Sequence, residues 1–249
     1  MEVKRKKLQG PLNILDFNRH FYFWGIGFFV IIFIVWQFFN GPSFIFGLLT
    51  FATLYALLMP LLIAGYVYDF SGFYELLWIS QHRIKNGNEK MIVNINAGFD
   101  ETSFQLKAFF PQATIKVFDF YDGAKHTEHA IVRARKETAN YLNTEQIVST
   151  AIPLQNRSVD IVFLIFAAHE IRSNKEKILF LKECKRVCTP TGKVIMVEHL
   201  RDIPNFLAFT IGFTHFFSRR CWRKAFAAAG FNTITEKKFT CFISIFKAS

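Results

Sequence analysis

Two long stretches without a formal charge occupy residues 21–39 and 44–68 of this chain of 249 residues. The first has 19 residues, and an α-helix of that length reaches about 28 Å, close to the thickness of the hydrocarbon core of a bilayer. Only residues 40–43 separate the two stretches, so helices formed from them must be antiparallel. We therefore predict a transmembrane helical hairpin over residues 21–68. A pair of buried helices in a soluble protein is the alternative, and it would need a very large core.

Basic residues flank this hairpin at both ends, whereas its connector carries no charge. They are Lys4, Arg5, Lys6, Lys7 and Arg19 before it, and Arg83, Lys85 and Lys90 after it. The positive-inside rule then places the basic N-terminal segment, residues 1–20, and the domain after the hairpin in the cytoplasm. We expect an integral membrane protein, of the inner membrane if the source is bacterial, with the anionic cytoplasmic leaflet as a partner. The net charge of +11 fits that partner, and no nucleic-acid-binding module is recognisable.

Residues 69–83 have a different composition, in which large apolar side chains mix with charged and polar ones. Tyr74 and Trp78 are residue types typical of the headgroup layer of a membrane. We therefore expect an interfacial helix followed by a linker over residues 69–89. A helix buried against the next domain is the alternative.

Residues 90–249 alternate short β-rich runs with helical patterns, which predicts one α/β domain with a parallel sheet and crossover helices. Strands are expected at residues 91–95, 115–118, 147–150, 159–166 and 192–197, with a closing antiparallel pair at residues 233–239 and 241–246. Helices are expected from about residue 100, and over residues 125–140, 175–187 and 218–229. A turn is expected at residues 189–192, before the fifth strand.

Three segments of this domain resemble the class I S-adenosylmethionine-dependent methyltransferases. Residues 152–163 resemble the family's stretch before the fourth strand, residues 180–193 the stretch before the fifth, and residues 222–231 the helix before the closing pair. The resemblance covers about 160 residues and is closest to the ubiquinone/menaquinone-type branch, the methyltransferase type 11 group. It implies a Rossmann-like seven-stranded sheet of order 3-2-1-4-5-7-6, and S-adenosylmethionine as the cofactor.

The resemblance also implies where the cofactor lies. The family's glycine-rich loop after the first strand corresponds to residues 94–100, and Asp119 takes the place of the acidic residue that holds the ribose hydroxyls. The expected contacts are Asn94, Asn96, Gly98, Asp119, Phe120, Thr150, Ala151 and Ala167. Of the loop glycines only Gly98 is in common, and Asp100 would repel the cofactor's carboxylate. A decayed or repurposed pocket is therefore the alternative.

The fourth and fifth strands end in two clusters of histidine and carboxylate residues. Open α/β sheets bind ligands beyond the carboxyl ends of their strands, so the two clusters are expected to meet at one crevice. We predict His169, Glu170 and His199 as the catalytic residues, with one histidine as the base and Glu170 or Glu198 orienting it. The alternative is that His169 and Glu170 shape the loop and pair with Arg172.

Two other polar patterns favour plain surface interpretations. His126, Glu128 and His129 would place metal-ligand types at the start of a helix, but no further ligand follows at a supporting spacing, so no metal is predicted. Residues 133–136, which are rich in arginine and lysine, are expected to be a solvated helix face, with a contact to phosphate groups as the less favoured alternative.

Residues 204–217 are apolar and carry no formal charge. We expect them to lie at the membrane surface, against lipid or an acceptor's tail, although an ordinary crossover helix is the alternative. The sequence thus predicts a membrane-anchored methyltransferase whose hydrophobic acceptor is a quinone or aromatic-polyene precursor or a phospholipid amine. The altered glycine loop leaves a second hypothesis open, a membrane scaffold with this fold that no longer transfers methyl groups. The sequence does not determine the acceptor, the attacking atom or the oligomeric state.

Overall fold

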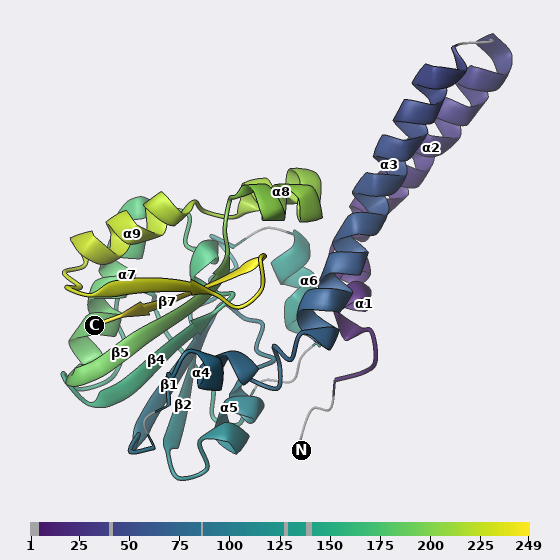
Figure 1. Cartoon of the computed structure of the whole chain (residues 1–249). Coiled ribbons are helices and arrows are strands. Elements are labelled where there is room, and N and C mark those ends of the chain that lie inside the picture. The colour runs from purple at the N-terminus through teal and green to yellow at the C-terminus, as the bar shows by residue number, and fades with distance from the viewer. Residues whose placement is uncertain (1–4, 40–41, 86, 127–128, 138–140) are drawn as a thin grey trace.

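A helical hairpin projects from an α/β domain (Figure 1). The computed structural model describes residues 5–39, 42–85, 87–126, 129–137 and 141–249. Helices α2 (Arg19–Phe39) and α3 (Ser43–Ala64) run side by side, and both are long and apolar enough to cross a membrane. Only 6% of each apolar stretch is buried, which is unlike the core helices of a soluble protein. The predicted connector at residues 40–43 lies partly outside the described residues.

A short helix, α1 (Gln9–Phe17), packs against the base of this hairpin. Helices α1 and α3 lie very close together at Gly10, where an added Cβ would be 2.7 Å from the carbonyl oxygen of Ala64. Helix α3 continues into a π-helical segment, η1 (Gly65–Phe70), where the Asp69 carboxylate accepts a hydrogen bond from the Gly10 N–H at 3.0 Å. The chain before the hairpin is therefore tied to the chain after it.

The segment after the hairpin covers one face of the sheet. It contains a short helix, α4 (Leu77–Gln81), and the side chains of Phe73, Trp78 and Ile79 are completely buried. The Trp78 indole N–H donates to the Phe73 carbonyl at 3.1 Å, and its ring lies edge-on to Phe163 in the sheet. This burial supports the buried-helix alternative for residues 69–83 over an interfacial helix.

The sheet has seven strands in the order β3-β2-β1-β4-β5-β7-β6, as predicted. The strands are β1 (Met91–Asn96), β2 (Thr114–Asp119), β3 (Glu145–Gln146), β4 (Val159–Ile165), β5 (Cys188–His199), β6 (Ile234–Lys238) and β7 (Ile243–Ala248). Strands β1 to β5 are parallel, and β7 is antiparallel to both of its neighbours. The carboxyl ends of β1, β2, β4 and β5 consequently share one edge of the sheet.

Helices cover both faces of this sheet. One face packs against α7 (Asn174–Val187) and α9 (Arg219–Ala228), and Phe180, Trp222 and Phe226 are buried there. The other face packs against α5 (Ser103–Phe109) and the α4 segment. Four more elements follow strands of the sheet: α6 (His129–Glu137), η2 (Ala168–Glu170), α8 (Ile203–Phe209) and η3 (Thr210–His215).

The segments that carry the family resemblance hold loops in place. The Asp160 carboxylate accepts from the backbone N–H groups of Lys90 and Met91 at 2.8 and 3.0 Å, which fixes the start of β1. The Arg186 guanidinium donates to the carbonyls of Ile152 and Leu154 at 2.7 and 2.8 Å, which fixes the approach to β4. These motifs therefore report on the fold rather than on a substrate.

Three local expectations differ from the structure. Residues 147–150 form a turn, and the third strand is β3, two residues earlier; the Ser149 hydroxyl binds Glu176 of α7 at 2.5 Å, so tertiary contacts override the β-rich pattern. The turn expected at residues 189–192 lies inside β5 as a bulge, at which the register to β4 shifts. The helix expected over residues 125–140 is described only as α6, and residues 127–128 and 138–140 lie outside the described residues.

Candidate functional site

The loop after β1 forms a tight turn around Gly98. Gly98 has a φ of +92°, a conformation that glycine adopts readily, and its N–H donates to the side-chain oxygen of Asn96 at 2.9 Å. The Nδ2 group of Asn96 is buried and has no hydrogen-bond partner among the described residues. A buried donor without a partner is costly, and a ligand that accepts its hydrogen bond would remove that cost.

The Asp119 carboxylate, at the end of β2, already has a cationic partner. Its Oδ1 accepts from the Tyr121 N–H at 2.8 Å, and its Oδ2 forms an ion pair with Nη1 of Arg135 on α6 at 2.7 Å. The Arg135 guanidinium lies 4.1 Å above the Tyr121 ring, and a Cβ added to Gly98 would be 2.2 Å from Arg135 Nη1. Arg135 thus fills the space above the turn. The prediction of a solvated face at residues 133–136 is wrong for this residue.

Two polar residues of the loop serve the start of α5. The Asn94 side chain is buried and donates to the hydroxyls of Ser103 and Thr102 at 2.8 and 3.2 Å. Asp100 Oδ1 accepts from the backbone N–H groups of the same two residues at 3.0 and 2.9 Å. The first backbone N–H groups of a helix have no partners within the helix, and a nearby anion can accept their hydrogen bonds. Asp100 therefore caps the start of α5.

The other four predicted cofactor contacts occupy different surroundings. Phe120 is buried, and its ring centroid lies 5.3 Å from that of Phe180. Ala167 is buried at the end of β4, whereas Thr150 and Ala151 are exposed in the turn before β4. The structure therefore brings Asn96, Gly98 and Asp119 together at one edge of the sheet, and their assignment to the cofactor stays a prediction.

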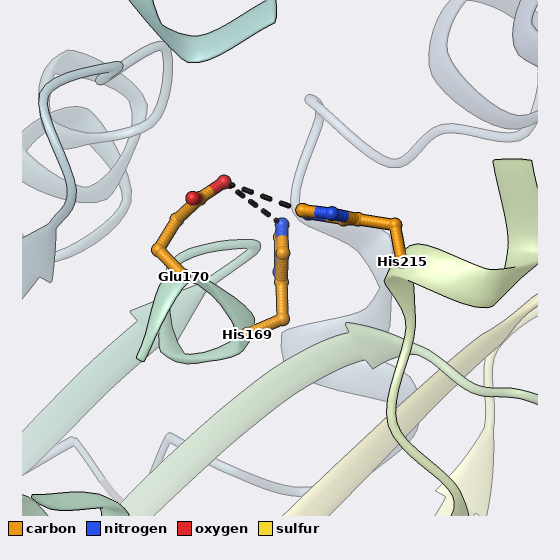
Figure 2. A group of neighbouring side chains, drawn as sticks. All are labelled: His169, Glu170 and His215. Carbon is orange, nitrogen blue, oxygen red and sulfur yellow. Dashed lines mark ion pairs between the residues drawn. The ribbon is translucent and has the colours of Figure 1, made fainter. Parts of the chain in front are cut away.

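A histidine and two carboxylates meet at the ends of β4 and β5. Nδ1 of His169 lies 2.7 Å from Oε2 of Glu198, and its Nε2 lies 3.4 Å from Oε1 of Glu170 (Figure 2). Burial alone would lower the pKa of His169, but the two carboxylates outweigh it and raise the pKa to about 10. Burial would raise the pKa of Glu170, but hydrogen bonds to His169 and His215 hold it well below its usual range. His169 is therefore cationic at neutral pH in this arrangement, which does not suit a general base.

His199 lies in an apolar surrounding. Its ring stacks against Phe166 on one side and Phe216 on the other, with centroid distances of 5.0 and 5.1 Å. Phe166 adopts a φ of +49°, an uncommon conformation for a residue with a side chain. Burial lowers the pKa of His199 to about 4, against smaller opposing effects of its hydrogen bonds, so the imidazole is neutral at pH 7.

The hydrogen bonds of His199 determine which nitrogen carries the proton. Nδ1 lies 3.1 Å from the side-chain oxygen of Asn205 and 3.0 Å from the carbonyl of Phe242, and both are acceptors. The proton therefore resides on Nδ1, and Nε2 accepts from the Tyr68 hydroxyl at 2.7 Å. Tyr68 belongs to η1, so a neutral imidazole of the sheet is joined directly to the last turn of the hairpin.

Helix α8 and η3 lie beside the hairpin. The Tyr55 hydroxyl of α3 donates to the Leu207 carbonyl at 2.7 Å, and α8 lies close to α3 in Figure 1. Ile203 and Ile211 are 75% and 74% exposed, and Phe206 and Leu207 are about half exposed. An apolar surface therefore extends from the hairpin over α8, where the ring of Phe209 lies 5.2 Å from that of the buried His199.

Sequence reasoning missed Arg135, Tyr68 and His215 as parts of these sites. Tyr68 is the last residue of the uncharged stretch and was counted with the membrane helix. His215 had a usable signal, because it is the one ionisable side chain within the apolar residues 204–217.

Residues 97–196 match a family described as a methyltransferase domain. The fold is that of the class I methyltransferases.

Two solved structures illustrate this fold. An S-adenosylmethionine-dependent methyltransferase from Aquifex aeolicus has 17% identity and a TM-score of 0.54, over 72% of this chain and 93% of that one. Human N-acetylserotonin methyltransferase, in complex with S-adenosylmethionine, has 14% identity and a TM-score of 0.55, over 97% of this chain and 70% of that one. No curated protein sequence matches the chain.

The residues at the β1–β2 edge fit the cofactor that the class I methyltransferase fold implies, with one rearrangement. Asp119 offers a carboxylate to hydroxyl groups, Gly98 allows close approach of a ligand, and Asn96 Nδ2 is a buried donor without a described partner. Arg135 must withdraw from Asp119 and Gly98 to make room. Its side chain is 31% exposed and has solvent to move into.

Proposed function

We propose that the chain is an S-adenosylmethionine-dependent methyltransferase that is anchored in a membrane and methylates a lipid-soluble acceptor. The observation that carries the proposal is the position of Asp119, the register partner of Asn96, beside the Gly98 turn at the carboxyl edge of a class I methyltransferase sheet. The match of residues 97–196 to a methyltransferase domain supports the reaction class.

The residues of the edge have separate roles in this proposal. Bound S-adenosylmethionine supplies a methyl group that its sulfonium has already activated for in-line displacement. Asp119 would accept hydrogen bonds from the ribose hydroxyls, and Asn96 Nδ2 would donate a hydrogen bond to the ligand. Gly98 would let the ligand approach the backbone closely. Arg135 must leave Asp119 before this can happen, so it competes with the nucleoside for the same carboxylate.

The acceptor would lie at the ends of β4 and β5. Methyl transfer needs alignment of the partners and a free lone pair on the acceptor atom. Of the two predicted histidines, His199 is the better candidate for a base, because it is neutral and its Nε2 accepts a hydrogen bond from the Tyr68 hydroxyl. With no metal ion bound, His169 is held as a cation between Glu170 and Glu198, which does not suit a base.

Membrane anchoring and a lipid-soluble acceptor rest on the apolar surface. The hairpin presents unburied apolar helices, and α8 adds exposed Ile203 and Phe206 beside it. An acceptor dissolved in lipid would reach the ends of β4 and β5 laterally along this surface, without passing through water. Quinone or aromatic-polyene precursors and phospholipid amines both satisfy this requirement. The catalytic domain would face the cytoplasm, as the flanking basic residues indicate.

A second function is favoured by one observation. Because Arg135 pairs with Asp119 and fills the space above Gly98, the fold would also suit a membrane scaffold that no longer binds the cofactor. Isothermal titration of the full chain in nanodiscs with S-adenosylhomocysteine separates the two. Micromolar binding that Asp119→Ala weakens at least tenfold supports the enzyme, and no binding at near-millimolar ligand supports the scaffold.

The acceptor class is tested by labelling. The full chain is incubated with methyl-labelled S-adenosylmethionine and either a total lipid extract or a water-soluble metabolite extract. A labelled lipid that disappears with Asp119→Ala supports the proposal. Label in water-soluble products alone contradicts a lipid-soluble acceptor, and the titration above still decides whether the cofactor binds.

A further inference from the structure

Three metal-ligand side chains converge between η2 and η3. The ligand atoms of His169, Glu170 and His215 all lie within 4.8 Å of one another, and Figure 2 shows the two rings directed toward the Glu170 carboxylate. We propose that these three residues bind a divalent transition-metal ion of the zinc type.

The spacing suits such an ion. Zinc binds imidazole nitrogen and carboxylate oxygen at about 2.0–2.2 Å, so two ligands of a tetrahedral site are about 3.4 Å apart. Glu170 Oε1 lies 3.4 Å from His169 Nε2 and 3.7 Å from His215 Nε2. The ligand nitrogens of the two histidines lie within 4.8 Å of each other, and the His215 side chain is 25% exposed.

A buried carboxylate orients the first of these ligands. Metal-binding histidines commonly donate their second ring N–H to a carboxylate, which fixes the tautomer and raises the basicity of the ligating nitrogen. Glu198 meets this requirement, because its Oε2 lies 2.7 Å from His169 Nδ1 and its side chain is only 1% exposed. An ion that displaces the proton from Nε2 would leave the Nδ1 proton directed at Glu198 and an Nε2 lone pair facing Glu170 and His215.

An arginine fixes the backbone of both histidines. The Arg172 Nη1 group donates to the carbonyl of His169 at 3.2 Å and to the carbonyl of His215 at 2.8 Å. The two histidines are 46 positions apart in the sequence, and this shared donor holds their segments together. The ligands are thus placed before any ion arrives, which lowers the ordering cost of binding.

A dication also satisfies the charge balance of the cluster. Glu170 and Glu198 are 8% and 0% exposed, and Arg172 directs Nη1 at backbone carbonyls. Two buried carboxylates need compensating positive charge nearby. One divalent ion bound by two neutral histidines neutralises both. Protons on both His169 and His215 would neutralise the same two charges, and this proton-only state is the competing outcome in the test.

Three protein ligands leave at least one coordination position for another molecule. Because the cluster lies at the ends of β4 and β5, that position would take an ionisable oxygen of the acceptor, such as a phenol or an enol. This last step rests on the proposed function, whereas metal binding itself does not.

The experiment measures the metal alone, without cofactor. The full chain, purified in detergent without a histidine tag and stripped with a chelator, is titrated with Co²⁺ and Zn²⁺. We expect one ion per chain by elemental analysis, and an intense visible Co²⁺ absorption typical of low coordination number. His215→Ala should lose the stoichiometric ion, and His82→Ala, a histidine on the opposite part of the domain, should retain it. Glu198→Gln should weaken the affinity 10- to 100-fold.

Circular dichroism of each variant confirms that it is folded. The inference is overturned if the folded wild-type chain binds no stoichiometric ion, which leaves the proton-only state. It is also overturned if His215→Ala and Glu170→Gln bind as well as the wild type does. Because S-adenosylhomocysteine is absent, these outcomes are independent of the cofactor titration.

Discussion

Replacing Arg135 with alanine should tighten the binding of S-adenosylhomocysteine. In the structure the Arg135 guanidinium forms a 2.7 Å ion pair with Asp119 and lies above Gly98. The proposed nucleoside site uses the same carboxylate and the same space. The ligand must therefore break this ion pair in the wild-type chain, and the variant removes that requirement.

The size of the effect follows from the ion pair. A hydrogen bond between charged groups contributes about 1.5–3 kcal/mol net, and the lower end applies because the Arg135 side chain is 31% exposed. A gain of about 1.5 kcal/mol corresponds to roughly tenfold tighter binding. The ligand-free variant should also lose about the same free energy of unfolding, since it loses the same bond. Stability in saturating ligand should change much less.

Isothermal titration and thermal unfolding of the full chain in nanodiscs measure both quantities. Lys136→Ala is the matched control, because Lys136 is an exposed neighbour on the same helix. It should change neither value. Weaker binding by Arg135→Ala would refute the reasoning, because it would mean that Arg135 contacts the ligand rather than competing with it. Unchanged affinity with reduced ligand-free stability would place the ligand elsewhere.

Further variants test the fold and the histidine site. Tyr68→Phe leaves the buried Nε2 of His199 without a donor and should lower the free energy of unfolding by about 1–3 kcal/mol, measured by chemical denaturation in detergent. His199 has a pKa of about 4 in the folded chain and about 6.5 when unfolded, so stability should fall by up to about 3 kcal/mol as the pH drops from 6.5 to 4. Denaturation midpoints of wild type and His199→Asn across this window check it, since the variant should lack that slope. Trp78→Ala should destabilise the domain by about 3–5 kcal/mol, and a loss below 1 kcal/mol would contradict its place in the core. Gly98→Ala should lower the free energy of unfolding, measured by thermal unfolding, by about 1–2 kcal/mol, because Gly98 has a φ of +92° that alanine adopts only at a cost.

Much of the sheet could be predicted because its local patterns agree with its tertiary structure. Strand β4 is a continuous apolar run, as expected for a strand covered on both faces, and α9 ends before Gly230, which has a φ of +90°. Where local pattern and tertiary contacts disagree, prediction failed. Ser149 lies in a β-rich segment, but its bond to Glu176 holds that segment as a turn. Trp78 is a residue type typical of the membrane surface, but its side chain is buried against the sheet.

The candidate sites were less predictable than the fold. A run of basic residues on a helix does not reveal that one of them, Arg135, reaches the end of a strand 16 positions earlier. Likewise, the spacing between His169 and His215 carries no information about whether they meet, because their proximity depends on how η3 returns over the sheet. The carboxyl edge of the sheet was predictable from the sequence, but the side chains that other elements contribute to it, such as Arg135 and His215, were not.

The cover that residues 73–79 give to the sheet has a practical consequence for anyone who wants a water-soluble version of this domain. Cutting the chain at residue 90, where the first strand begins, would strip Phe73, Trp78 and Ile79 from the hydrophobic surface that they shield. Such a fragment would be expected to aggregate, and its inactivity would say nothing about catalysis. A cut just after η1 keeps that lining, yet still discards Tyr68 and with it the only described hydrogen bond to His199 Nε2.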